Sequence, residues 1–391
     1  ILVESAALFF FFLIFQKWKR PFLLLVPALV CLVLINHAAN GKAGNLVQKE
    51  DYQEITDSAW QDAVRDALDG ETGLCRTEQS GVAKKRKDNV NRIWNMRQWT
   101  TSVYSSAYDT EYQNFRNNVF QVEQPFRNGL MQSASANPLF QKFMGVKYVI
   151  GRSEDGENFT TEVQETAAPV IYGTNRVIAE KTYQAMKFPY NQTMLMQYAV
   201  TGNEKITDAG VEKTKGIQET NVTFTAKRGV TKEDDSWKIK TKKEQKATLS
   251  LDEDTSGKER ILYLQFDVEN GHPNRDVSIV INGIRNKLTA KSHLYYNDNT
   301  TFTYVMKLSA DQEKIKVTFG AGTYRICNLK SYVSDTTVLE DASLYRSTFT
   351  PDRNATKGNQ ISGSIEMEQD GYLITSIPYD SHLEIKVDGR E

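Results

Sequence analysis

The stretch ILYLQFDV (residues 261–268) decides the fold class of the largest part of this chain. Its apolar side chains alternate along the backbone and share one face: Leu262, Leu264, Phe266 and Val268. Gln265 and Asp267 fall on the opposite face. Because successive side chains of a strand point to opposite faces, this pattern predicts a β-strand that packs one face against a core.

Three neighbouring stretches repeat the alternation: DVSIVING (276–283), TFTYVMKL (301–308) and IKVTFGAGTYRI (315–326). The first ends on Asn282-Gly283, which is a strong signal for a two-residue hairpin turn. Five or more short strands with turns at regular intervals indicate a β-sandwich of the jelly-roll type.

The N-terminal segment carries two apolar runs, residues 1–15 and 21–38, on either side of a short basic hinge. The hinge contains Lys17, Lys19 and Arg20. Each run is near the lower limit of the roughly 17–25 residues that a helix needs to cross a bilayer, so the segment predicts a transmembrane hairpin. Since Lys and Arg favour the cytoplasmic side, we expect the rest of the chain to lie outside the cytoplasm.

Two other interpretations of this segment stay open. A signal peptide would use residues 17–20 as its basic region and 21–36 as its apolar core. Its cleavage site at residues 37–40 would be poor, and the apolar run upstream would have no role. A buried helical hairpin of a globular domain would have to place Phe9 to Phe12 in succession, which suits a helix with one wet face badly.

The clearest local prediction is for NPLFQKFMGVKYVI (residues 137–150). Asn137 is a good N-cap, and Pro138 suits the first helical position. Gly145 fits the left-handed residue that ends a helix, so a strand is expected to begin directly after it. Further short strands are predicted at residues 169–172 and 175–179.

An amphipathic helix is predicted earlier in the chain, because Trp60, Val64 and Leu68 form one apolar stripe that Gly70 ends.

The sequence as a whole therefore predicts a membrane-anchored α+β chain. Its expected parts are a transmembrane hairpin (1–40), a juxtamembrane amphipathic helix (41–70), a small extracytoplasmic mixed α/β domain (71–200), a jelly-roll-like β-sandwich (201–340) and a truncated terminal β-hairpin module (341–391).

Composition excludes several classes of function. The net charge is −1 with 25% charged residues, so no overall electrostatic attraction to nucleic acid is expected. Three cysteines are too few for a disulfide framework. Cys75 and Cys327 are the one pair available outside the apolar segment, and two unrelated thiols are the simpler interpretation. The four histidines are dispersed, and we assign no catalytic, cofactor-binding or metal-binding residue.

Three features have both a functional and a plain structural interpretation. The basic run at residues 83–88 suits a phosphate group, but such runs usually face water. Asp252, Glu253 and Asp254 resemble the start of a calcium loop that lacks its later ligand. Aromatic residues between positions 91 and 112 suit a sugar-stacking surface or, more commonly, a core; they are Trp94, Trp99, Tyr104, Tyr108 and Tyr112.

Three motifs are similar to those of the bacterial YfhO-type membrane protein family. The first is the strand motif at Gly145, Val146, Lys147, Tyr148, Val149 and Ile150. The second is the hairpin motif at Ile377, Pro378, Tyr379, Asp380, Val387, Asp388 and Gly389. The third is the set Arg76, Glu78, Asn91, Tyr104, Ser105 and Ser106. His382-Leu383 departs from the Gly-Trp usual in the family, which puts any role of that Trp in doubt.

This resemblance covers roughly residues 70–391 through the order of its motifs. It implies a polytopic glycosyltransferase of the GT-C type, which moves a sugar from a polyprenyl-phosphate donor to a cell-surface polymer such as teichoic acid. The catalytic carboxylate of such enzymes is expected outside residues 1–391, which leaves acceptor binding or scaffolding to this region. The alternative function is a non-catalytic, membrane-anchored module that binds cell-wall glycan.

Overall fold

The computed structural model divides into two compact units, Ile1–Asp57 and Ser58–Glu391, which we call unit 1 and unit 2. The structure describes residues 12, 13, 16, 25–43, 49, 58–80, 99–102, 109–126, 134–153, 158–202, 216–252 and 257–390. The predicted hinge residues Lys17, Lys19 and Arg20 lie outside the described residues. The predicted domain boundaries within unit 2 stay predictions.

The prediction of a membrane-anchored α+β fold with two transmembrane helices is wrong. Among the described residues, no helix combines the length and the apolar character needed to cross a bilayer. The long helix of unit 1, α2 (Leu25–Ala43), includes Asn36, His37, Asn40 and Lys42 in its C-terminal part. These polar residues lower the mean hydropathy of the helix below that of the apolar run on which the prediction rested. The described part of the chain is mainly β-sheet with short helices.

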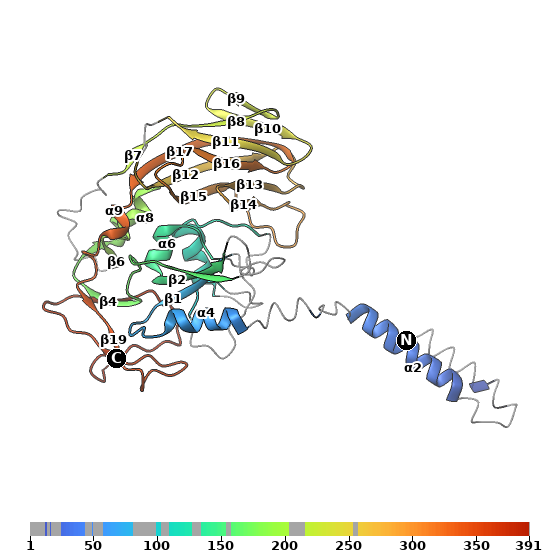
Figure 1. Ribbon diagram of the computed structural model, residues 1–391, viewed down its shortest axis with the longest axis horizontal. Helices are drawn as coiled ribbons and strands as arrows, with labels where there is room; N and C mark the ends of the chain where they lie inside the picture. Colours follow the sequence, from blue (N-terminus) through green and yellow to red (C-terminus); the bar gives the residue numbers. More distant parts are fainter. Residues whose placement is uncertain are drawn as a thin grey trace. The chain divides into compact units, whose positions relative to one another are not determined.

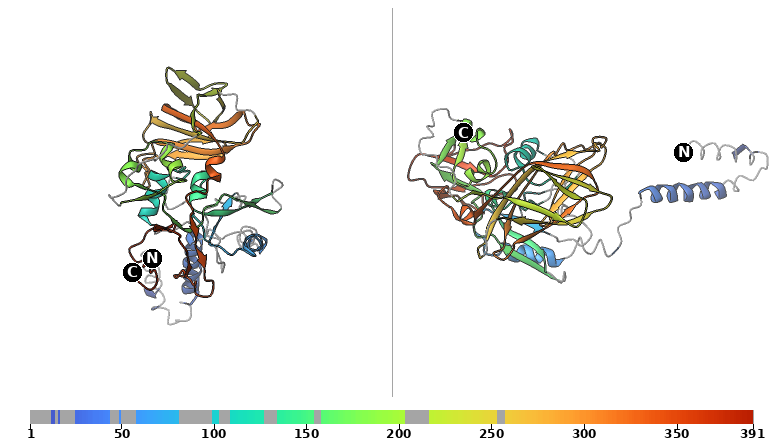
Figure 2. Two further views of the ribbon diagram at one scale, coloured as in Figure 1. Left: turned by 90° about the vertical axis from the view of Figure 1, so that its left-hand side faces the viewer. Right: turned by 90° about the horizontal axis from the view of Figure 1, so that it is seen from above.

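The jelly-roll-like β-sandwich is confirmed, and Figure 2 shows its strands in two stacked layers. Sheet 1 has the order β15-β12-β17-β10-β9, with β7 paired to β17. Its strands are β7 (Gln218–Glu219), β9 (Val230–Glu233), β10 (Ser236–Thr241), β12 (Arg260–Asn270), β15 (Thr301–Leu308) and β17 (Gly322–Asp335). Sheet 2 has the order β14-β13-β16-β11-β8. Its strands are β8 (Val222–Ala226), β11 (Gln245–Leu251), β13 (Val277–Ile281), β14 (Ile284–Leu288) and β16 (Lys314–Phe319).

The predicted inward face of β12 does line the core between the sheets. Leu262, Leu264, Phe266 and Val268 all belong to that cluster. The Asn282-Gly283 turn is also confirmed, with φ of 51° and 83° in the hairpin between β13 and β14. Such left-handed φ values suit Asn and Gly, and they match the twist of the two strands.

A second core covers the other face of sheet 1. Ile261 and Tyr263 of β12 and Val305 of β15 are buried there against Phe140 and Phe188. Figure 1 shows α6 and α8 next to this sheet. The helices of unit 2 are α4 (Ser58–Leu68), α5 (Thr110–Asn114), η2 (Phe115–Val119, a π-helix), α6 (Pro138–Phe143), α7 (Glu180–Gln184), α8 (Tyr190–Met194) and α9 (Thr337–Glu340).

The helix-to-strand prediction at residues 137–150 is confirmed. The Asn137 side chain accepts hydrogen bonds from the backbone N–H of Leu139 (3.0 Å) and Phe140 (3.3 Å) at the start of α6. Gly145 has φ of 67° after the helix. Strand β2 then pairs in parallel with β1 and antiparallel with β3. The bounds are β1 (Arg76–Ser80), β2 (Val146–Arg152) and β3 (Phe159–Val163).

Alanine at position 137 is expected to lower the free energy of unfolding by about 1–2 kcal/mol. The change removes the cap of α6 and the bond from Asn137 Nδ2 to Gln192 Oε1 (2.9 Å). Urea unfolding followed by circular dichroism measures the loss, with the exposed Asn359→Ala as control. Equal midpoints for the two variants would show that the cap does not stabilise the fold.

The terminal module differs from its prediction. Strand β21 (Tyr372–Thr375) does form, but it joins β4 (Ile171–Thr174), on whose other side β18 (Ser347–Thr348) pairs. The remaining strands are β5 (Val177–Ala179), β6 (Ala199–Thr201), β19 (Thr350–Pro351) and β20 (Gly363–Ser364). No strand is found over Leu383, Ile385 and Val387, which are 53–60% exposed. These alternating apolar residues therefore form no strand of the predicted terminal hairpin module, and an isolated bridge joins Val387 to Arg390.

Candidate functional site

One pocket, which we call the motif pocket, is lined by Gly145 and Lys147 of the family-like strand motif. It has a volume of about 240 Å³. Its wall combines the segment before β1, the start of β2 and the segment before β4. The lining residues are Glu71, Gly73, Leu74, Cys75, Gly145, Lys147, Gln164, Glu165, Ala167, Ala168, Pro169, Val170, Ile171, Thr348 and Phe349.

An ion pair crosses the pocket wall. Lys147 Nζ lies 2.5 Å from Glu71 Oε2, and the same oxygen accepts a hydrogen bond from the Tyr148 hydroxyl at 2.8 Å. The backbone N–H of Gly73 donates to Glu71 Oε1 at 2.9 Å. The Glu71 side chain is 12% exposed and the Lys147 side chain 34% exposed. Lys147 therefore keeps donor capacity for a ligand, whereas Glu71 is occupied by protein donors.

These contacts set the charge state of Glu71. Burial acts to raise the pKa of its carboxyl, but the hydrogen bonds from Lys147, Gly73 and Tyr148 outweigh it and lower the pKa to about 2. The hydrogen bond to Glu71 likewise raises the pKa of Lys147. Both groups are thus charged at neutral pH. A carboxyl with so low a pKa is a poor general acid or base, so the pair is suited to binding rather than to proton transfer.

Glutamine at position 71 is expected to destabilise the protein by about 1 kcal/mol at neutral pH, a value discounted for the partial exposure of the pair. Because the folded pKa lies below the unfolded value of 4.5, the stabilisation is complete above that pH and is lost as the pH falls towards 2. The difference in unfolding free energy between wild type and Glu71→Gln should therefore shrink across this window. Urea titrations at several pH values measure it, and a constant difference would contradict the assigned ion pair.

Arg76 makes buried contacts with Met144 and Ser376, the residues directly before the strand motif and the hairpin motif. Arg76 as a residue is 5% exposed. Nη1 donates to the carbonyl oxygen of Met144 and to Ser376 Oγ (2.7 Å), and Nη2 donates to the carbonyl oxygen of Ser376 (2.9 Å). The backbone N–H of Ser376 in turn donates to Val170 O at 2.9 Å. Arg76 thus holds the chain directly before the hairpin motif against the start of β2.

Glu78, within β1, also makes buried hydrogen bonds. The residue is 2% exposed, and its carboxylate accepts from the backbone N–H and hydroxyl of Thr101 and from Ser102 Oγ (3.0 Å). Burial raises the pKa of this carboxyl, and the same hydrogen bonds oppose the rise. Tyr112 donates its hydroxyl to Thr101 O and packs on the second core, so its core interpretation is confirmed.

Gly145 closes the pocket wall at a point where no side chain fits. A Cβ atom there would lie 2.8 Å from the carbonyl oxygen of Ala168, and the φ of 67° is unfavourable for other residues. The glycine is therefore explained by the close approach of two backbones. Of the predicted motif residues, Gly145 and Lys147 line the pocket, and Tyr148 completes its ion pair.

Other predicted residues lie apart from the pocket or outside the described chain. Val387, Asp388 and Gly389 form an exposed turn. Asn91, Trp94, Tyr104, Ser105, Ser106, Tyr108, Glu253, Asp254 and the basic run 83–88 lie outside the described residues. Residues of the site that the sequence did not indicate are Glu71 and Ser376. Each lies far along the chain from its partner, so spacing carried no signal.

The motif pocket contains one thiol, that of Cys75, which is weakly reactive. Burial raises the pKa of Cys75 to about 11, so it stays protonated and weakly nucleophilic at neutral pH. Cys75 and Cys327 are both free, which rules out the pair as a disulfide in this structure. Among the described residues, no group of three or more His, Cys, Asp or Glu side chains is placed to hold a metal ion.

Comparison with known proteins gives one family and several distant structures. The family model described as bacterial membrane protein YfhO matches residues 1–391. No curated protein matches the chain. A structure of a peptidoglycan O-acetylesterase is 8% identical with a TM-score of 0.17, and the match covers 32% of this chain and about a third (32%) of the esterase.

Two carbohydrate-related structures are similar at the same level. The C-terminal CBM6 of LamC from Zobellia galactanivorans is 11% identical with a TM-score of 0.19, covering 29% of this chain and 100% of the module. An exo-β-1,3-galactanase from Phanerochaete chrysosporium is 15% identical with a TM-score of 0.19, covering 31% of this chain and 30% of the enzyme. Similarity this weak carries no argument about the function of this chain.

Proposed function

Because the chain belongs to the YfhO family of bacterial membrane proteins, we propose that it acts in the glycosylation of a cell-surface polymer. In this proposal residues 58–391 lie outside the cytoplasm and hold the acceptor, a polymer such as teichoic acid. The sugar comes from a polyprenyl-phosphate donor, and its transfer takes place elsewhere in the protein. The chain thus supplies acceptor binding and scaffolding.

The motif pocket is the observation that carries this proposal. Its volume of about 240 Å³ is below the roughly 300–1,000 Å³ usual for drug-sized ligands, and it suits a group the size of one sugar ring. Lys147 offers N–H donors, Gln164 offers an amide, and Phe349 adds an aromatic side chain to the wall. Lys147 and Gln164 can hydrogen-bond to the hydroxyl groups of one sugar ring, and Phe349 can pack against an apolar face of that ring.

A second candidate function is a glycan-binding module without transfer activity. The charge state of Glu71 suits this candidate equally well, because an ionised carboxylate does not supply a proton to a leaving group. Arg76 and Gly145 also have structural explanations that need no chemistry. The two candidates differ in one observable: whether the surface polymer loses sugar when the protein is absent.

A genetic comparison in the producing bacterium tests the proposal. Deletion of the gene is expected to remove one sugar from the surface polymer, and the wild-type gene is expected to restore it. Lys147→Met should restore about a tenth of that sugar or less, because the pocket loses its cationic donor. Lys291→Met, at an exposed lysine, serves as the matched control. Unchanged sugar content in the deletion strain would reject transfer and leave the binding module.

A further inference from the structure

Unit 2 contains a second and larger cavity, which we call the amide cleft. It has a volume of about 570 Å³ and lies between the α5–η2 segment and the sandwich residues at the start of β15. The helical wall comprises Thr110, Gln113, Asn114, Asn117, Asn118, Gln121, Val122 and Gln124. The sandwich wall comprises Asn297, Asp298, Asn299, Thr300, Thr301 and Thr303.

The lining of the amide cleft is polar and almost uncharged. Eight of its residues are Asn or Gln and four are Thr, while Asp298 is the one ionisable side chain among them. Amides and hydroxyls offer both donors and acceptors without a net charge. Such a lining matches a ligand that itself carries many hydroxyl groups. It offers no cation to a polyanion and little apolar surface to a lipid chain.

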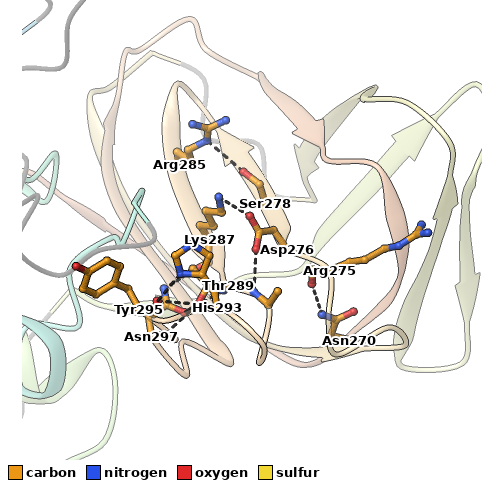
Figure 3. Close-up of polar contacts among 11 residues, drawn as sticks. Asn270, Arg275, Asp276, Ser278, Arg285, Lys287, Thr289, His293, Tyr295 and Asn297 are labelled. Carbon is orange, nitrogen blue, oxygen red and sulfur yellow. Dashed lines mark hydrogen bonds and ion pairs between the residues drawn. The ribbon is translucent and has the colours of Figure 1, made fainter. Parts of the chain in front are cut away.

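The sandwich wall is held in place by a hydrogen-bonded loop. Asn297 Oδ1 accepts from the backbone N–H (3.0 Å) and the hydroxyl (3.1 Å) of Thr289. Asn297 Nδ2 donates to the carbonyl oxygen of Lys287 at 2.7 Å. Figure 3 shows this loop beside the ion pair between Lys287 and Asp276 (2.6 Å). Because that cation is already neutralised by Asp276, it adds no attraction for an anion.

The helical wall is partly fixed and partly free. Gln121 has an unusual φ of 47°, and its Oε1 accepts from Gln265 Nε2 of β12 at 2.9 Å. Left-handed backbone at a residue other than glycine is costly and tends to occur at functional sites. By contrast, no hydrogen bond joins the side chains of Gln113 and Asn117 to any described residue. These half-buried amides lie four positions apart, so they face the cleft together.

We propose that the amide cleft binds an uncharged, hydroxyl-rich glycan chain, with Gln113, Asn117 and Thr300 as its free hydrogen-bonding groups. A volume of about 570 Å³ is larger than the motif pocket and within the range of roughly 300–1,000 Å³ found for ligand sites. The cleft is separate from the motif pocket. The inference therefore goes beyond the proposed function, because it holds whether or not sugar transfer occurs.

Calorimetric titration of the full chain tests the proposal with defined probes. The neutral probes are hexamers of glucose joined α-1,4, glucose joined β-1,4 and N-acetylglucosamine; the acidic probe is a hexamer of galacturonic acid. At least one neutral hexamer is expected to bind, and more tightly than the acidic one. Gln113→Ala/Asn117→Ala should weaken that binding about tenfold, as expected for the loss of two hydrogen bonds.

Thr300→Val provides an independent variant on the opposite wall, because it removes a hydroxyl at an exposed position with little change in shape. It should also weaken binding, whereas Asn359→Ala, remote from the lining, should not. Lys291→Met, at an exposed lysine outside both linings, should also leave neutral-glycan binding intact. The proposal is overturned if no neutral hexamer binds, if the acidic probe binds best, or if the cleft variants bind as wild type.

Discussion

Replacing Tyr263 with alanine is expected to lower the free energy of unfolding by about 3–5 kcal/mol, as for other large aromatic residues removed from a core. The Tyr263 side chain is fully buried on the second face of sheet 1. Its ring lies 6.4 Å from that of Phe188, and its hydroxyl is 3.1 Å from Ser334 Oγ. The change therefore removes packing between the sandwich and the helices and one of the two hydrogen-bond partners of the Ser334 hydroxyl, which still donates to the carbonyl oxygen of Asp335.

Urea unfolding of the full chain, followed by tyrosine fluorescence and circular dichroism, measures this loss. Tyr295→Ala is the matched control, because Tyr295 is 45% exposed on the loop shown in Figure 3. The control should change the free energy by less than about 0.5 kcal/mol. A loss below about 1 kcal/mol for Tyr263→Ala would show that the second core contributes little to folding.

Arg76→Met is expected to destabilise the protein by about 3 kcal/mol, the second largest effect that we predict. The substitution keeps much of the side-chain volume but removes the donors to the carbonyl oxygens of Met144 and Ser376. Both acceptors would then be buried with fewer hydrogen bonds, and desolvation of an unpaired acceptor is costly. The segment around Ser376, directly before the hairpin motif, should detach from β2 first, because Arg76 is a main link between them.

Ser376→Ala separates the two parts of that effect. It removes the bond from Nη1 to Ser376 Oγ (2.7 Å) but keeps the backbone contact of Nη2. We expect a loss of about 1 kcal/mol, clearly below that of Arg76→Met. Hydrogen exchange of residues 372–377 provides the local readout. Equal protection of these amides in wild type and Arg76→Met would contradict the link.

Local patterns predicted the sandwich and the helix-to-strand unit because both depend on neighbours in sequence. Alternation in residues 261–268 identified the strand and its inner face, as the core cluster confirms. The same stretch did not indicate that Tyr263 packs on a second core, since periodicity does not say what lies against a face. Residues 383–387 show the converse, because their apolar side chains alternate in the sequence and yet form no strand.

The candidate site was less accessible to prediction than the fold. Lys147 was recognised within a family-like strand motif, but its partner Glu71 lies 76 positions earlier. The contact between Arg76 and Ser376 spans 300 positions. Only the tertiary structure brings such residues together, through the parallel pairing of β1 with β2 and the pairing of β21 with β4. The transmembrane prediction failed for a local reason, because α2 extends into polar residues.

In the proposed function, the motif pocket holds a unit of a surface polymer through Lys147. Calorimetric titration of the full chain with purified teichoic acid fragments tests it most directly. We expect saturable binding by wild type, unchanged binding by Lys291→Met, and binding about tenfold weaker for Lys147→Met, which loses a charge-assisted hydrogen bond. Equal affinities for wild type and Lys147→Met, or no binding by wild type, would contradict the claim.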